Sequence, residues 1–167
     1  RVLFRSGSAA FPINAVNACL QAAELTVPDV DYVAFYEQPF LKLERVLVDH
    51  ATSFPLSLMN FLRTMPAWLS DRLVLPFNLS RDLGFEKRTL FIKHHLAHAA
   101  SAFLVSPFEE AAVMTVDGVG EWASATQGVG RGSTIEIHRE MRYPDSLGLL
   151  YTAVTTYLGF AANRGEG

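Results

Sequence analysis

The chain of 167 residues is long enough for one ordinary domain or two small halves, and half of it is hydrophobic. Only 19% of its residues are charged, a composition that supports a buried core and excludes intrinsic disorder. The net charge of −3, from 14 basic and 17 acidic residues, provides no basic surface for nucleic acid or for an anionic membrane.

The single cysteine, Cys19, excludes an intramolecular disulfide, and no run of about 18 apolar residues predicts a membrane span. Residues 1–6 resemble no signal peptide, and the chain ends in a polar stretch, 163–167, with no terminating element. We therefore expect an internal fragment of a longer, cytoplasmic protein.

The first half of the chain begins with a predicted helix and a predicted buried strand. Pro12 fits the first position of a helix, and apolar residues recur at helical spacing as far as Leu25. Residues 32–36 then form an unbroken apolar and aromatic run, which is typical of strands buried on both faces.

Residues 39–83 are rich in Leu, Phe and Met but are interrupted by prolines, which disfavour a place in a sheet. We therefore expect a helical insertion there, followed by a second buried strand over 89–92 and an alanine-rich helix over 95–105. The pattern then changes near Pro107, which divides the chain into a first half, 1–107, and a second half, 108–167.

The second half is predicted to open with a three-stranded meander over 111–116, 122–129 and 134–141, joined by glycine-containing turns. A helix over 147–160 follows, so the order of elements predicts a mixed α/β fold. Alternation along the third strand places four residues on one face: Ile135, Ile137, Arg139 and Met141.

The densest chemical signal lies at the predicted junction between the second strand and its helix. On a helix, positions i and i+4 lie about 5–6 Å apart at Cβ, so His94 and His98 can both reach one metal ion. His95 points about 100° away from them. Asp117 closes a buried strand and precedes two glycines, where backbone can approach a phosphate or metal closely. Together His94, His98 and Asp117 form a set of two histidines and one carboxylate that suits Fe(II), Mn(II) or Zn(II).

Each of these residues also has a purely structural interpretation. Histidines at a helix start can serve as caps or hydrogen-bonded residues, and Asp-Gly is a common hairpin pair. Glu121 faces either the same cavity or solvent, and Arg131, between two glycines, is expected to be solvated. Cys19 is expected in the core, and His50 and His138 are expected to be structural or surface residues.

Several separate motifs occur in one order along the chain: YEQPFLK at 36–42, HHLAHAASAF at 94–103, DGVGEW at 117–122, SLGLLY at 146–151 and NRGEG at 163–167. In this order they resemble the O-carbamoyltransferase family, the group that includes nodulation-factor and antibiotic carbamoyltransferases. The likeness extends over almost the whole chain, and the last motif resembles the start of the family's N-x-G-E-x-K segment.

The resemblance implies an actin-like ATPase (ribonuclease H-like) fold, here incomplete, related to the universal tRNA threonylcarbamoyl-transfer protein. It implies a divalent metal, typically iron, held by His94, His98 and Asp117, with a further aspartate ligand beyond the end of this chain. The positions that it assigns to nucleotide or carbamoyladenylate binding are Gly118, Gly120, Glu121 and Glu166.

The same resemblance implies transfer of a carbamoyl group from carbamoyladenylate to a hydroxyl of a sugar or small molecule. Carbamoyladenylate would be made from carbamoyl phosphate and ATP by a C-terminal domain that this chain lacks. The expected partners are that domain and the hydroxyl acceptor, with no nucleic acid and no membrane, and homo-oligomerisation stays open. Without the second domain and the remaining ligand, we expect the fragment alone to be inactive.

Two alternatives stay open. A tRNA-modifying threonylcarbamoyl transferase of the same fold would need a basic stripe, which the charge of −3 does not indicate. A non-catalytic scaffold would use the apolar insertion over 39–83 as a protein interface and would carry no metal in proportion to protein.

Overall fold

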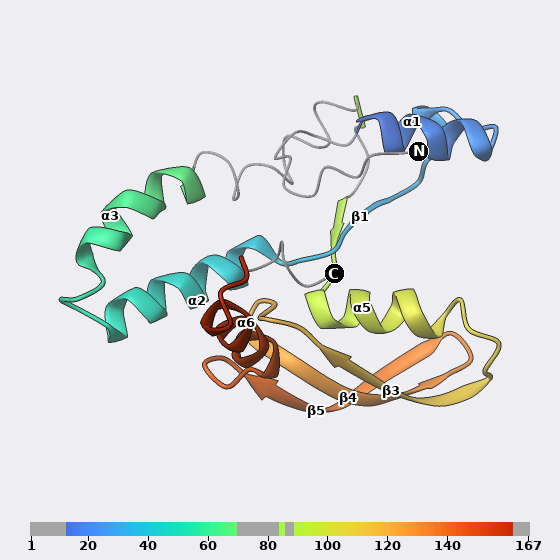
Figure 1. Ribbon diagram of the computed structural model, residues 1–167. Coiled ribbons are helices and arrows are strands. Elements are labelled where there is room, and N and C mark those ends of the chain that lie inside the picture. Colours follow the sequence, from blue (N-terminus) through green and yellow to red (C-terminus); the bar gives the residue numbers. More distant parts are fainter. Residues whose placement is uncertain (1–12, 70–83, 86–88, 162–167) are drawn as a thin grey trace.

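The computed structural model describes residues 13–69, 84–85 and 89–161, which form two small sheets and several helices (Figure 1). In the first sheet, strand β1 (Val33–Phe35) pairs in parallel with β2 (Thr89–Phe91). Two strands far apart in sequence are therefore neighbours, and the long segment between them leaves the sheet and returns.

The second sheet is antiparallel and follows chain order. It consists of β3 (Glu110–Val116), β4 (Ala123–Arg131) and β5 (Thr134–Arg142). Gly132 has a φ of 56° in the tight turn between β4 and β5, a left-handed conformation that glycine adopts without strain. The predicted meander is confirmed, as is the mixed α/β class, whereas the actin-like arrangement stays a prediction.

The helices lie at the positions where the sequence pattern predicts them. Two of them fall in the predicted helical insertion, of which residues 70–83 lie outside the described residues. A third lies along one face of the antiparallel sheet, and the last contacts strand β4 (Figure 1). In chain order the described helices are α1 (Ile13–Ala22), a 3-10 turn (Val27–Asp29), α2 (Pro39–Thr52), α3 (Leu58–Ala67), α5 (His94–Phe103) and α6 (Leu147–Tyr157).

The expected full burial of β1 and β2 is wrong for the described residues. Ala34 is exposed, and every other residue of the two strands is only partly buried. Flanking aromatic side chains are more open still, with Tyr32 61% and Tyr36 56% exposed. A parallel strand is buried only when layers cover both faces of its sheet, and the described residues cover this pair in part.

The core lies between α5 and the antiparallel sheet. Ala99 and Phe103 of α5 pack against Val113 of β3 and are almost fully buried with it. Gly130 of β4 makes this contact possible, because a Cβ there would lie 2.5 Å from the Phe103 ring. This close contact fixes the distance of α5 from β3 and β4, and β3 leads directly to Asp117.

A β-bulge in β5 overturns the prediction that Ile135, Ile137, Arg139 and Met141 share a face. Gln127 pairs with Arg139 and Gly128 pairs with Ile137, which leaves His138 as an extra residue. The bulge reverses the alternation of side chains beyond it. One cavity is consequently lined by Ile135, Ile137, Glu140 and Arg142, whereas Arg139 lines a different hollow.

Candidate metal centre

The first two side chains of the centre come from the N-terminal half of α5. The helix begins shortly after β2, at His94, and its first two turns present His94 and His98 on one face. Their ring centroids are 4.5 Å apart, and the two rings are nearly perpendicular, at 89°. The distance between their Nε2 atoms is 3.0 Å, so the spacing expected from sequence is realised in the structure.

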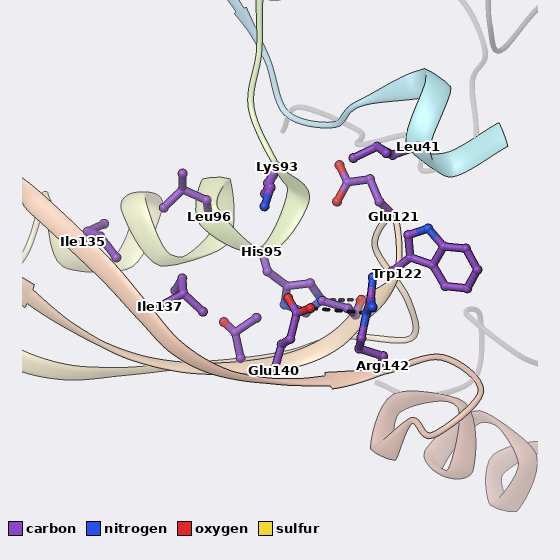
Figure 2. A pocket seen from close by; sticks show the side chains of 12 residues that line it. Leu41, Lys93, His95, Leu96, Glu121, Trp122, Ile135, Ile137, Glu140 and Arg142 are labelled. Carbon is purple, nitrogen blue, oxygen red and sulfur yellow. Dashed lines mark hydrogen bonds and ion pairs between the residues drawn. The ribbon is translucent and has the colours of Figure 1, made fainter. Parts of the chain in front are cut away.

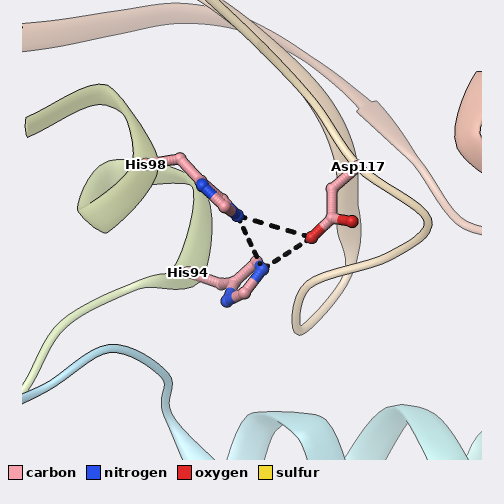
Figure 3. A group of neighbouring side chains, drawn as sticks. All are labelled: His94, His98 and Asp117. Atoms are coloured by element: carbon pink, nitrogen blue, oxygen red, sulfur yellow. Dashed lines mark hydrogen bonds and ion pairs between the residues drawn. The ribbon is translucent and has the colours of Figure 1, made fainter. Parts of the chain in front are cut away.

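The third side chain is that of Asp117, the residue that follows β3. Its backbone N–H donates to the carbonyl of Ser124 at 2.9 Å, and its Oδ1 accepts a bond of 2.6 Å from the N–H of Gly118. Oδ2 is then directed at the histidines, 2.6 Å from His94 Nε2 and 3.5 Å from His98 Nε2 (Figure 3).

The start of α6 supports the backbone of Asp117 from the other side. Ser146 caps α6 by accepting the N–H of Leu149 at 3.0 Å, and its hydroxyl lies 2.5 Å from the carbonyl oxygen of Gly118. A Cβ at Gly148 would lie 2.4 Å from the carbonyl oxygen of Asp117. Only glycine at this position allows α6 to pack so closely against the Asp117 backbone.

The three donor atoms fit a single divalent cation. Ligand atoms about 2.1 Å from one ion, at tetrahedral or octahedral angles, are about 3.0–3.4 Å apart. The two separations from His98 Nε2, 3.0 and 3.5 Å, are close to this range, and the separation between His94 Nε2 and Asp117 Oδ2, 2.6 Å, is shorter. An imidazole nitrogen carries either a proton or a lone pair. His94 Nε2 therefore cannot donate to Asp117 and also accept from His98, whereas one cation between the three atoms satisfies all of them.

Hydrogen bonds and neighbouring charge favour an ionised carboxylate at Asp117, beside a histidine, His98, that solvent can reach. The Asp117 side chain is 38% exposed, and partial burial alone would raise its pKa. Hydrogen bonds from His94 and from the Gly118 N–H outweigh that effect and hold the pKa of Asp117 below its ordinary value. The side chain of His98 is 50% exposed, which leaves one side of the group open.

The third histidine of the cluster, His95, has a structural role. It is 3% exposed, and its Nε2 donates to the carbonyl of Ala123 at 2.9 Å. Nδ1 is then an acceptor for the hydroxyl of Thr115 at 2.7 Å, and Thr115 contacts Thr126 at 2.6 Å. Burial lowers the pKa of His95 more than the Ala123 carbonyl raises it, so the ring is neutral and joins α5 to β3 and β4.

Three of the four predicted nucleotide-binding residues lie in the turn after Asp117: Gly118, Gly120 and Glu121. A Cβ at Gly120 would lie 3.0 Å from the Cβ of His94, so this turn presses directly on α5, whereas Gly118 is more open. Glu121 is buried rather than solvent-exposed, at 6% exposure, and its carboxylate binds backbone N–H groups. Glu166 lies outside the described residues.

A cavity of about 340 Å³ lies beside this group, between the start of α5 and β5. Figure 2 shows Leu96, Ile135 and Ile137 along one part of its wall, with Glu140 and Arg142 farther along β5. His95 and Glu121 line the cavity, but none of the three candidate metal ligands does. The cavity is therefore distinct from the metal group, although residues next to the candidate ligands line it.

The remaining candidate residues lie apart from the centre. Cys19 is exposed on α1, so its expected place in the core is wrong. Arg131 is on the surface and pairs with Glu110 at 2.8 Å. His50 packs edge-on against Phe61, and His138 forms the bulge of β5.

Sequence reasoning missed several residues that hold the centre together. The position of Ser146 before an apolar helix is a recognisable N-cap signal. The contacts of Thr115 with His95 and with Thr126 depend on the packing of α5 on β3 and on the pairing of β3 with β4, which no local pattern reveals. The same holds for the close approach of Gly148 to Asp117.

Comparison with known proteins identifies the family. The family described as Carbamoyltransferase N-terminus matches residues 5–167, and the chain belongs to this family. The described residues contain no helix that is both long and apolar enough to cross a membrane.

Three relatives illustrate the likeness. An uncharacterised protein of Synechocystis sp., sll1178, is 44% identical over 166 residues, which cover 95% of this chain and 27% of that protein. Nodulation protein NolNO of Sinorhizobium fredii is 35% identical over 156 residues, covering 89% of this chain and 21% of the relative. Nodulation protein NolO of Bradyrhizobium diazoefficiens is 40% identical over 68 residues, 41% of this chain and 12% of the relative. The chain thus spans about a quarter of the length of the first two.

Proposed function

We propose that this chain is the metal-binding part of an O-carbamoyltransferase that moves a carbamoyl group from carbamoyladenylate to a hydroxyl of a sugar or small molecule. Membership of the carbamoyltransferase family supports the transfer reaction. The observation that carries the proposal is the convergence of His94, His98 and Asp117, whose donor atoms all lie within 4.8 Å of one another.

The chemistry of carbamoyl transfer suits such a group. The acceptor hydroxyl attacks the carbamoyl carbon and loses its proton, while the bond from that carbon to the AMP phosphate oxygen breaks and AMP leaves as an anion. A bound divalent cation, Fe(II) in our proposal, supplies a Lewis acid that offsets the negative charge developing on oxygen. In this proposal His94 and His98 bind it as neutral imidazoles and Asp117 as a carboxylate.

Access to the group comes from its open side. His98 is half exposed, and the turn after Asp117 begins with Gly118, where an added Cβ would meet nothing within 4 Å except the end of the Leu149 side chain. We place the approach of the phosphate or carbamoyl oxygens at Gly118, because glycine backbone permits close contact, whereas Gly120 packs against His94.

The complete reaction requires parts outside this chain. We propose that an adenylate-forming domain makes carbamoyladenylate from ATP and carbamoyl phosphate, and that a further aspartate completes the ligand set. Glu166 is retained as a nucleotide-binding residue in this proposal.

The test is a transfer assay on a polypeptide that contains this chain together with an adenylate-forming domain. ATP, labelled carbamoyl phosphate and a panel of hydroxyl acceptors should give labelled acceptor and AMP in equal amounts. The His98→Ala protein should lose the transfer step, and the 167 residues alone should give no product. Labelled acceptor formed equally fast by the His98→Ala protein would contradict the proposal.

A further inference from the structure

The carboxylate of Glu121 is buried in a place where burial needs an explanation. Glu121 is 6% exposed, and its carboxylate forms no ion pair with any cationic side chain in the described ranges. Removing a carboxylate from water without a compensating partner is costly. The bonds that it accepts therefore indicate what it does.

Within the described residues, those bonds come from backbone N–H groups of two other segments of the chain. Oε1 accepts the N–H of Gln38, just before α2, at 2.8 Å, and the N–H of His94 at 3.1 Å. Oε2 also lies 3.1 Å from the N–H of His94. Figure 2 shows the Glu121 side chain reaching toward the region between Leu41 of α2 and Lys93.

Glu121 thereby caps α5 from outside the helix. The first N–H groups of a helix have no partner within it, and Lys93, at the N-cap position, provides no side-chain bond. A carboxylate at this end also interacts favourably with the helix dipole. The capped residue, His94, is one of the three candidate metal ligands.

The same side chain is attached to the turn that carries Asp117. Hydrogen bonds from Asp117 N–H to Ser124 and from Gly120 N–H to Ala123, at 2.9 and 2.8 Å, close this turn. Glu121 lies inside it, four residues after Asp117. Its bond to the His94 N–H therefore joins the Asp117 turn to the start of α5, the two segments whose side chains form the candidate metal site.

We propose that Glu121 is a positioning residue, which holds the Asp117 turn against the start of α5 so that His94 and Asp117 can share one cation. The inference rests on the metal site of the proposed function. Residues that orient metal ligands without touching the metal typically contribute about 10- to 100-fold to its affinity.

The test is a titration of this chain with Co²⁺, followed by visible absorption, at a temperature where far-ultraviolet circular dichroism shows each variant to be folded. Glu121→Gln keeps the shape of the side chain but loses its charge and turns an N–H donor toward the backbone N–H groups. Glu121→Asp keeps the charge but is one methylene shorter. Glu136→Gln removes one negative charge from an exposed position on β5 and serves as the matched control.

We expect Glu121→Gln to bind Co²⁺ about 10-fold or more weakly, with a changed visible spectrum, and Glu121→Asp to lie between it and the unsubstituted chain. Glu136→Gln should bind like the unsubstituted chain. Unchanged affinity and spectrum in the folded Glu121 variants would overturn the inference, and Glu121→Asp decides alone if Glu121→Gln does not fold. Failure of the unsubstituted chain to bind Co²⁺ would instead count against the proposed metal site itself.

Discussion

His94, His98 and Asp117 make contacts that compete with one another when no cation is present. The Nε2 atom of His94 lies 2.6 Å from Asp117 and 3.0 Å from His98, and it can serve only one of them as donor. These side chains are therefore arranged for ligation more than for mutual stabilisation. Loss of one ligand should affect metal binding more strongly than folding.

His98→Ala tests this at the level of a single residue. The side chain of His98 is half exposed and packs little, so the free energy of unfolding should change by less than about 1 kcal/mol. Loss of a direct ligand should weaken Co²⁺ binding by more than about 10-fold in a direct titration. His138→Ala, at an exposed position on β5, is the control and should bind normally. Retained affinity in the His98 variant would show that His98 is not a ligand.

At the scale of elements, the distance between α5 and the antiparallel sheet determines whether the histidines and Asp117 meet. Phe103 lies against Gly130 at one end of α5, and His95 is bonded to β3 and to the start of β4 at the other. Both contacts hold the helix close to the strands.

Gly130→Ala should therefore destabilise the fold by about 1–3 kcal/mol, because the added Cβ would lie 2.5 Å from the Phe103 ring. Urea unfolding followed by circular dichroism measures this change. Gly118→Ala is the contrasting variant, since the nearest atom to its Cβ would be Leu149 Cδ2, at 3.9 Å. Equal stability of the two variants would mean that α5 does not pack on β4 as described.

A second connection between elements joins α2 to the segment after β5. The hydroxyl of Tyr143 donates to Asp49 Oδ1 at 2.8 Å, and the Arg45 guanidinium lies 5.2 Å from the centre of the Tyr143 ring. The bond to Asp49, with burial, raises the pKa of Tyr143 above its ordinary value. The neutral phenol is thus favoured in the folded chain.

This shift predicts a stability difference that depends on pH. Since the folded chain holds the phenol proton more tightly than the unfolded chain, the contribution of Tyr143 is complete below pH about 10 and is lost as pH rises through the folded pKa. Tyr143→Phe should cost about 1 kcal/mol at about pH 8, and the difference from the unsubstituted chain should shrink above about pH 10. Urea unfolding at both pH values measures it, and a difference that does not vary with pH would refute the assignment.

At the scale of the whole molecule, patterns local in sequence were sufficient for the helices, the meander and the pairing of His94 with His98. The partnership of these histidines with Asp117 spans 23 residues from His94 and depends on how α5 packs over β3. The residue types suggested this set and the family resemblance implied it, whereas the Asp-Gly pair by itself was also compatible with a simple hairpin.

Other features were beyond local patterns for the same reason. The alternation of Ile135 and Ile137 with polar residues continues through His138, so nothing in the sequence marks the bulge that turns Arg139 to another face. The burial of Glu121 likewise depends on two backbone N–H groups, one from α5 and one from the residue before α2. The bulge and the burial of Glu121 both depend on contacts between segments that are distant in sequence, which local patterns do not reveal.

One cation held by two imidazoles and one carboxylate is the central feature of the proposed site. X-ray absorption on the Fe(II)-loaded chain, prepared without oxygen, measures this directly. We predict one iron per chain, with two imidazole ligands at about 2.1 Å and the remaining ligands oxygen. Iron far below one equivalent, or a spectrum without imidazole scattering, would contradict the account.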